Sequence, residues 1–128
     1  MNLDENKFQQ AFLEEADELA QHLIENLLNL EKDPLNSDVI NEIFRMTHSI
    51  KSEAALVGFN VISEISHKME DVFDKVRTDN IELNNQHIDY LFEASDLIKS
   101  KLEAIANSGS EDDSGLSDIL EKLEIIVA

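Results

Sequence analysis

Four histidines are the side chains of this sequence best suited to chemistry near neutral pH, because the ordinary pKa of imidazole is close to 6.5. We interpret two of them, His22 and His87, as surface residues. Polar residues surround His22, and His87 falls in the first turn of an expected helix. His48 and His67 are therefore the two candidates for a functional role.

His48 lies beside the apolar positions of its segment, and Lys51 follows one helical turn later. Two nearby residues, Ser52 and Ala55, are small and would leave the imidazole open to an approaching protein. The lysine supplies a point charge that suits phosphoryl oxygens. Taken alone, the segment is also compatible with an ordinary surface histidine on an amphipathic helix.

The pair His67 and Glu70 is spaced to share one helix face. If the chain reverses at Gly58, His48 lies ten residues before the turn and Glu70 twelve after it. In an antiparallel helix pair these two side chains fall at similar heights and can meet. A carboxylate that holds the proton of one ring nitrogen leaves the other nitrogen unprotonated and nucleophilic. The alternative is a solvated His–Glu pair within one helix.

Glu64 and His67 have the Glu-x-x-His spacing of di-iron bundles. Such centres use two copies of the motif, and none of the other histidines has a glutamate three residues before it. We therefore expect no metal ligands and no bound cofactor. The sequence also lacks a glycine-rich phosphate loop, so we expect no ATP site in this chain.

The composition excludes several classes of partner. The chain has 128 residues with 28 acidic and 10 basic side chains, a net charge of −18, which disfavours nucleic acids and anionic membranes. It has no cysteine, which excludes disulfides and thiol chemistry. The N-terminal residues 1–6 lack the layout of a signal peptide, and no apolar run approaches about 18 residues. We expect a cytoplasmic protein.

The helices that must position these side chains follow from apolar residues recurring every third or fourth position. Three glycines and one proline in 128 residues also favour long helices and few loops. We predict helices over about 3–30, 37–57, 60–78 and 84–106, with a capping-box spacing at Asn2 and Glu5 and a C-terminal cap at Gly58. This pattern predicts an all-α, antiparallel up-down four-helix bundle over residues 1–106.

The composition changes after the fourth helix. Residues 107–115 contain two of the three glycines and no apolar side chain, which predicts a flexible acidic linker. An accessory helix is expected over 116–127. Its apolar stripe needs a partner, so it either packs back on the bundle or docks elsewhere.

Two segments together carry a family resemblance: Thr47-His48-Ser49-Ile50-Lys51, with Ala54-Ala55 and Gly58-Phe59 after it, and His67-Lys68-Met69-Glu70. The sequence resembles the histidine phosphotransfer (HPt) domain, in the form found at the N-terminus of CheA-type chemotaxis histidine kinases. The resemblance implies that His48 is the phosphoacceptor through Nε2 and that Glu70 holds its Nδ1 hydrogen. It implies that Lys51 and His67 complete the hydrogen-bond network.

The resemblance also implies the partners. A separate kinase domain, in the same polypeptide or a dimer mate, would use ATP and Mg²⁺ to phosphorylate His48. The phosphoryl group would then pass to an aspartate of a CheY- or CheB-like receiver. A freestanding phosphorelay shuttle and a helical adaptor without chemistry are the alternatives. The family usually has glycine after the lysine, where this chain has Ser52 and then Glu53, which puts partner choice in doubt.

Overall fold

The computed structural model describes residues 3–128, with side-chain surroundings from residue 7 onward. The helices are α1 (Leu3–Lys32), α2 (Ser37–Leu56), α3 (Asn60–Asp79), α4 (Asn85–Ser108) and α5 (Leu116–Val127). Residues 3–128 contain no strand, so the all-α prediction is confirmed. The helix ends lie within two residues of the predicted ones. The expected capping box at Asn2 and Glu5 lies outside the residues whose side chains are described.

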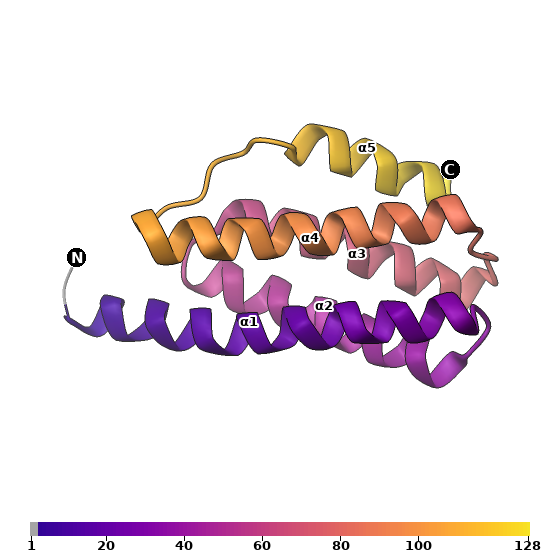
Figure 1. Cartoon of the computed structure of the whole chain (residues 1–128), viewed down its shortest axis with the longest axis horizontal. Coiled ribbons are helices and arrows are strands. Elements are labelled where there is room, and N and C mark those ends of the chain that lie inside the picture. Colours follow the sequence, from indigo (N-terminus) through magenta and orange to yellow (C-terminus); the bar gives the residue numbers. More distant parts are fainter. Residues whose placement is uncertain (1–2) are drawn as a thin grey trace.

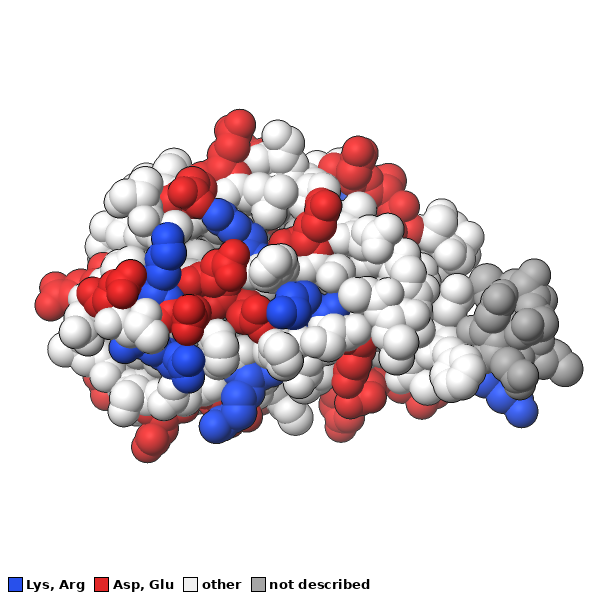
Figure 2. Space-filling view, turned by 180° about the vertical axis from the view of Figure 1, so that it is seen from behind, with Lys and Arg blue, Asp and Glu red and all other residues white. Residues whose placement is uncertain are grey.

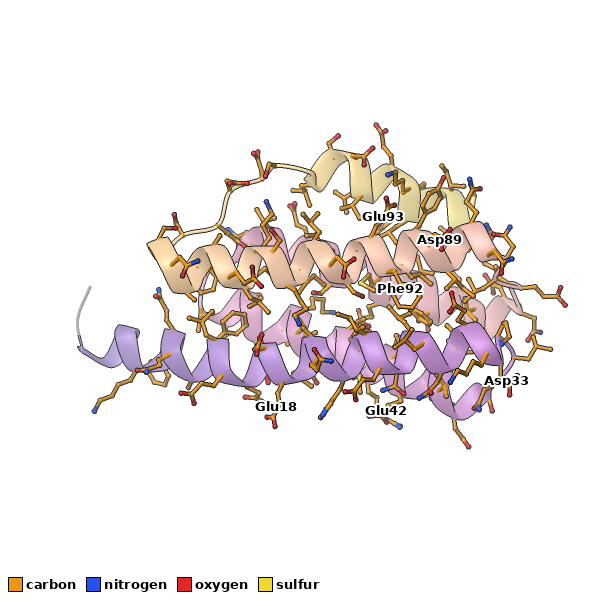
Figure 3. The ribbon with its side chains drawn as sticks, in the orientation of Figure 1. Glu18, Asp33, Glu42, Asp89, Phe92 and Glu93 are labelled. Carbon is orange, nitrogen blue, oxygen red and sulfur yellow. The ribbon has the colours of Figure 1, made fainter. Side chains whose placement is uncertain are left out.

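Helices α1 to α4 form the up-down bundle, and α5 lies along its outside (Figure 1). Going round the bundle, α1 contacts α2 and α4, and α3 contacts α2 and α4. The apolar stripes meet in one core, whose largest fully buried side chains include Leu23, Leu27, Ile43, Ile50, Ile65, Phe73, Leu91 and Ile98. Acidic residues such as Glu18 point away from the bundle (Figure 3). None of the described helices is long and apolar enough to cross a membrane.

The turn between α2 and α3 is set by Gly58, whose φ is +85°. Its amide donates to the carbonyl of Ala55 at 3.2 Å, and the Phe59 amide donates to Ala54 at 2.9 Å. This pair of bonds is the Schellman motif, which uses glycine because a Cβ is strained at positive φ. The predicted C-terminal cap at Gly58 is confirmed, and it makes α2 and α3 an antiparallel pair with a short connection.

Side chains cap the N-termini of two other helices. Asn36 accepts a hydrogen bond from the Val39 amide at 3.2 Å at the start of α2. Asn84 accepts one from the His87 amide at 2.8 Å, and His87 Nδ1 accepts one from the Asn84 amide at 3.3 Å. His87 thus belongs to a capping box that fixes the start of α4.

The segment between α4 and α5 is held by specific contacts, which the prediction of a flexible linker did not include. The buried Lys101 ammonium donates to Asp112 Oδ1 at 2.8 Å, to the Ser114 carbonyl at 2.8 Å and to Ser114 Oγ at 3.1 Å. Glu111 accepts hydrogen bonds from the amides of Val61 at 2.8 Å and Ile62 at 3.1 Å. Glu111 thereby caps α3, whose own N-cap residue offers no side chain for this purpose.

Helix α5 packs back on the bundle, which decides the alternative left open by the sequence. It lies against α3 and α4 and buries Ile119, Leu123 and Ile126 in the common core. An ion pair between Lys68 of α3 and Glu124 of α5 also links these two helices. The fifth helix is therefore packed as part of the same hydrophobic core as the bundle.

Candidate functional site

The α2–α3 pair brings His48 and Glu70 together, as their distances from the turn predicted. His48 Nδ1 and Glu70 Oε2 are joined by a hydrogen bond. The other carboxylate oxygen, Oε1, accepts a hydrogen bond from Lys51 Nζ at 2.8 Å. A further hydrogen bond, from Ser63 Oγ to the Lys51 carbonyl at 3.1 Å, links α3 to α2 nearer Gly58. Two side chains of α2 thus bind both oxygens of a carboxylate on α3.

The members of this site differ sharply in exposure. The His48 side chain is 58% exposed, whereas the Glu70 side chain is 11% exposed and that of Lys51 is 24% exposed. Ser52 and Ala55, the small residues expected to leave space near the imidazole, are both exposed. Figure 2 shows the face formed by α2 and α3, where acidic and basic side chains are interspersed. The imidazole is therefore open to a partner while its carboxylate is shielded.

The protonation of the pair follows from the environment of Glu70. Burial by itself raises the pKa of this carboxyl, but hydrogen bonds and charges from Lys51 and His48 outweigh it and hold the pKa below its usual range. Glu70 is therefore ionised at neutral pH and can only accept hydrogen bonds. The proton of a neutral His48 must then sit on Nδ1, which leaves the lone pair on Nε2 free.

Two roles were predicted for Lys51 from the sequence, as a charge for phosphoryl oxygens and as a member of the hydrogen-bond network around His48. In the structure its ammonium donates directly to Glu70. The contact both neutralises the carboxylate and fixes its orientation toward His48. Contact of Lys51 with a phosphoryl group stays a prediction.

His67 lies on the same face of α3 as Glu70, but its ion-pair partner is Asp71. Its Nε2 is 3.7 Å from Asp71 Oδ1, one turn along the helix. Within the described residues no hydrogen bond joins His67 to His48 or Glu70. Its place in the His48 network therefore stays a prediction.

Sequence reasoning missed the surroundings of Glu53. Its side chain meets Glu15 of α1, and burial, a hydrogen bond with Glu15 and the charge of Glu15 raise the pKa of Glu53 to about 7. Glu53, which follows the serine at the family's usual glycine position, thus packs against α1. No sequence signal links Glu15 to Glu53, because only the packing of α1 on α2 brings them together.

An exposed imidazole with a free Nε2, oriented by a shielded carboxylate on a four-helix bundle, defines a domain that can carry a group on a ring nitrogen. Comparison with known proteins narrows this class. The family model of the Hpt domain matches residues 7–108. The chain belongs to the Hpt domain family.

Its relatives include chemotaxis proteins. The chain is 37% identical to the chemotaxis protein CheA of Borreliella burgdorferi over 97% of its own length, and it spans 14% of that relative. The solution structure of the histidine phosphotransfer domain of a CheA is 29% identical, with a TM-score of 0.85 over 92% of this chain and 90% of that one.

A third comparison shows the fold alone. The phosphorylated P1 domain of CheA3 from R. sphaeroides, solved in complex with CheY6, is 20% identical. Its TM-score is 0.85 over 94% of this chain and 96% of that one.

Proposed function

We propose that this chain is the phosphoryl-carrying domain of a CheA-like chemotaxis kinase and that His48 is its phosphoacceptor. The observation that carries the proposal is the hydrogen bond between the exposed His48, at Nδ1, and the shielded, ionised Glu70. Because Nδ1 is held by Glu70, the other ring nitrogen, Nε2, faces away from Glu70 and keeps its lone pair free. Lys51 supports the arrangement by orienting Glu70.

In the charging step the Nε2 lone pair attacks the γ-phosphorus of ATP held by a kinase domain. The N–P bond forms as the bond between the γ-phosphorus and the β,γ-bridging oxygen breaks, and ADP leaves. The ring then carries both the phosphoryl group and the Nδ1 hydrogen, so it gains positive charge. Glu70 accepts that hydrogen bond and stabilises the charge, which makes it a positioning and electrostatic residue.

In the discharging step an aspartate carboxylate of a receiver domain attacks the same phosphorus. The O–P bond forms, the N–P bond breaks, and His48 returns to its neutral form with the proton still on Nδ1. The R. sphaeroides neighbour is a phosphorylated domain in complex with CheY6, and a receiver of this kind is the partner we propose here. The kinase domain supplies ATP and Mg²⁺, and the exchange takes place in the cytoplasm.

The test is to incubate the chain with a CheA kinase domain and radiolabelled ATP, and to repeat the reaction with His48→Gln. We expect acid-labile, alkali-stable label on the wild-type chain and none on the variant. His22→Gln is the matched control, since it removes an exposed histidine of α1, and it should be labelled like the wild type. Equal labelling of the His48→Gln variant would refute the assignment.

A further inference from the structure

A second group of side chains lies directly beside the site. His67, Glu70 and Asp71 occupy neighbouring positions on one face of α3, and each places a potential ligand atom within 4.8 Å of the other two. His67 Nε2 and Asp71 Oδ1 are the nearer pair, at 3.7 Å. Their side chains are 59% and 53% exposed, so an ion can reach them without opening the bundle.

The spacing of these atoms is close to that of a tetrahedral metal site. Zinc binds histidine nitrogen and carboxylate oxygen at about 2.0–2.2 Å, which places neighbouring ligand atoms about 3.3–3.6 Å apart. The 3.7 Å between His67 and Asp71 needs little adjustment, and a change of side-chain torsions brings Glu70 within range. One imidazole and two carboxylates also form a ligand set suited to zinc.

We propose that His67, Glu70 and Asp71 bind a divalent transition metal, with zinc as the test ion, and that binding draws Glu70 away from His48. The histidine favours zinc over magnesium, which prefers oxygen ligands and gives up its waters reluctantly. The fourth position stays open to water. Zinc binding goes beyond phosphoryl transfer and does not require it.

The consequence for His48 follows from the shared carboxylate. Glu70 already accepts hydrogen bonds from His48 and Lys51, so a metal on one of its oxygens competes with those donors. The Lys51 ammonium, 2.8 Å from Oε1, also repels the ion and must shift as Glu70 turns. Zinc therefore loosens the bond that fixes the His48 proton on Nδ1.

Calorimetric titration of zinc chloride into the chain tests the binding. We expect one zinc per chain, not displaced by excess magnesium. His67→Ala and Asp71→Asn should each weaken binding at least about tenfold, the smaller end of the loss seen when even a supporting residue of a metal site is removed. Glu70→Gln should weaken it similarly. His22→Ala, at an exposed histidine outside the cluster, is the matched control and should bind as the wild type does.

Imidazole NMR signals test the proposal that zinc draws Glu70 away from His48. Zinc should shift the ring-nitrogen signals of His67 through direct ligation and those of His48 through loss of Glu70. Wild-type affinity in His67→Ala, or equal loss in His22→Ala, would overturn the site. Unmoved His48 signals at saturating zinc would overturn the competition for Glu70. Circular dichroism verifies that each variant is folded, and the labelling of His48 by a kinase domain is a separate measurement.

Discussion

Replacing Glu70 with glutamine tests the central contact most directly, because the side chain keeps its size and loses its charge. The amide oxygen can still accept the hydrogen bond from His48 Nδ1. The amide nitrogen can instead donate to Nδ1, which moves the ring proton to Nε2 and blocks the nucleophile. The variant therefore loses the negative charge that stabilises the phosphorylated ring. It also no longer restricts the ring proton to Nδ1, the tautomer in which Nε2 can react.

The size of the electrostatic loss can be worked from the geometry. Opposite unit charges about 4 Å apart interact by about 4 kcal/mol at an effective dielectric constant of about 20. The His48 side chain is 58% exposed, so water screens part of this energy. Halving it leaves about 2 kcal/mol of stabilisation for the positive charge that develops on the ring, or about 30-fold in rate. A population of the blocked tautomer would add to that loss.

The assay is the initial rate of phosphorylation by a kinase domain at saturating ATP, with thermal unfolding measured on the same sample. We expect Glu70→Gln to slow the reaction about 30-fold or more while the domain remains folded. Glu64→Gln is the matched control, since it makes the same change at an exposed site of α3 and should leave the rate unchanged. A Glu70→Gln rate within about twofold of wild type would refute the role given to the carboxylate.

Two further carboxylates give predictions about stability. The pKa of Glu53 is raised from 4.5 to about 7, so the folded domain binds more protons than the unfolded chain, and stability falls as pH rises between those values. Glu53→Gln should therefore raise the melting temperature at pH 8 more than at pH 5, and a gain that is the same at both pH values would contradict this. Glu111→Gln should lower the free energy of unfolding in urea by about 1 kcal/mol, because it weakens the cap of α3. Glu103→Gln, at an exposed site of α4, is the control, and an equal loss there would remove the capping argument.

The sequence predicted those parts of the site that depend on regular geometry. Apolar spacing located the helices, and glycine at residue 58 located the turn that makes α2 and α3 antiparallel. With the turn placed, the heights of His48 and Glu70 followed from counting residues. That is why a contact spanning 22 residues could be predicted without coordinates.

Contacts between segments far apart in the sequence could not be predicted by counting residues from a turn. Glu111 caps a helix that begins about 50 residues earlier, and Lys101 is buried because the following segment folds over it. The sequence placed Glu111 in a flexible acidic linker, and no sequence pattern indicated that Lys101 is buried. The same holds for Lys51, since helical spacing gave its distance from His48 along α2 but not the carboxylate to which it turns.

The charge balance of the site bears on how the phosphoryl group leaves it. The formal charges of neutral His48, the Glu70 carboxylate and the Lys51 ammonium sum to zero. Lys51 is already paired with Glu70. Transfer of the phosphoryl group adds one net negative charge to a chain whose net charge is −18, because the ring keeps its Nδ1 hydrogen and its positive charge offsets part of the charge on the phosphoryl oxygens. Apart from the charge on the ring itself, the hydrogen-bond network of His48, Glu70 and Lys51 offers the phosphoryl oxygens no unpaired positive charge. Stabilising cations must come from the partner, as side chains or as Mg²⁺, so we expect phosphohistidine to lose its phosphoryl group far faster in a receiver complex than in the free domain.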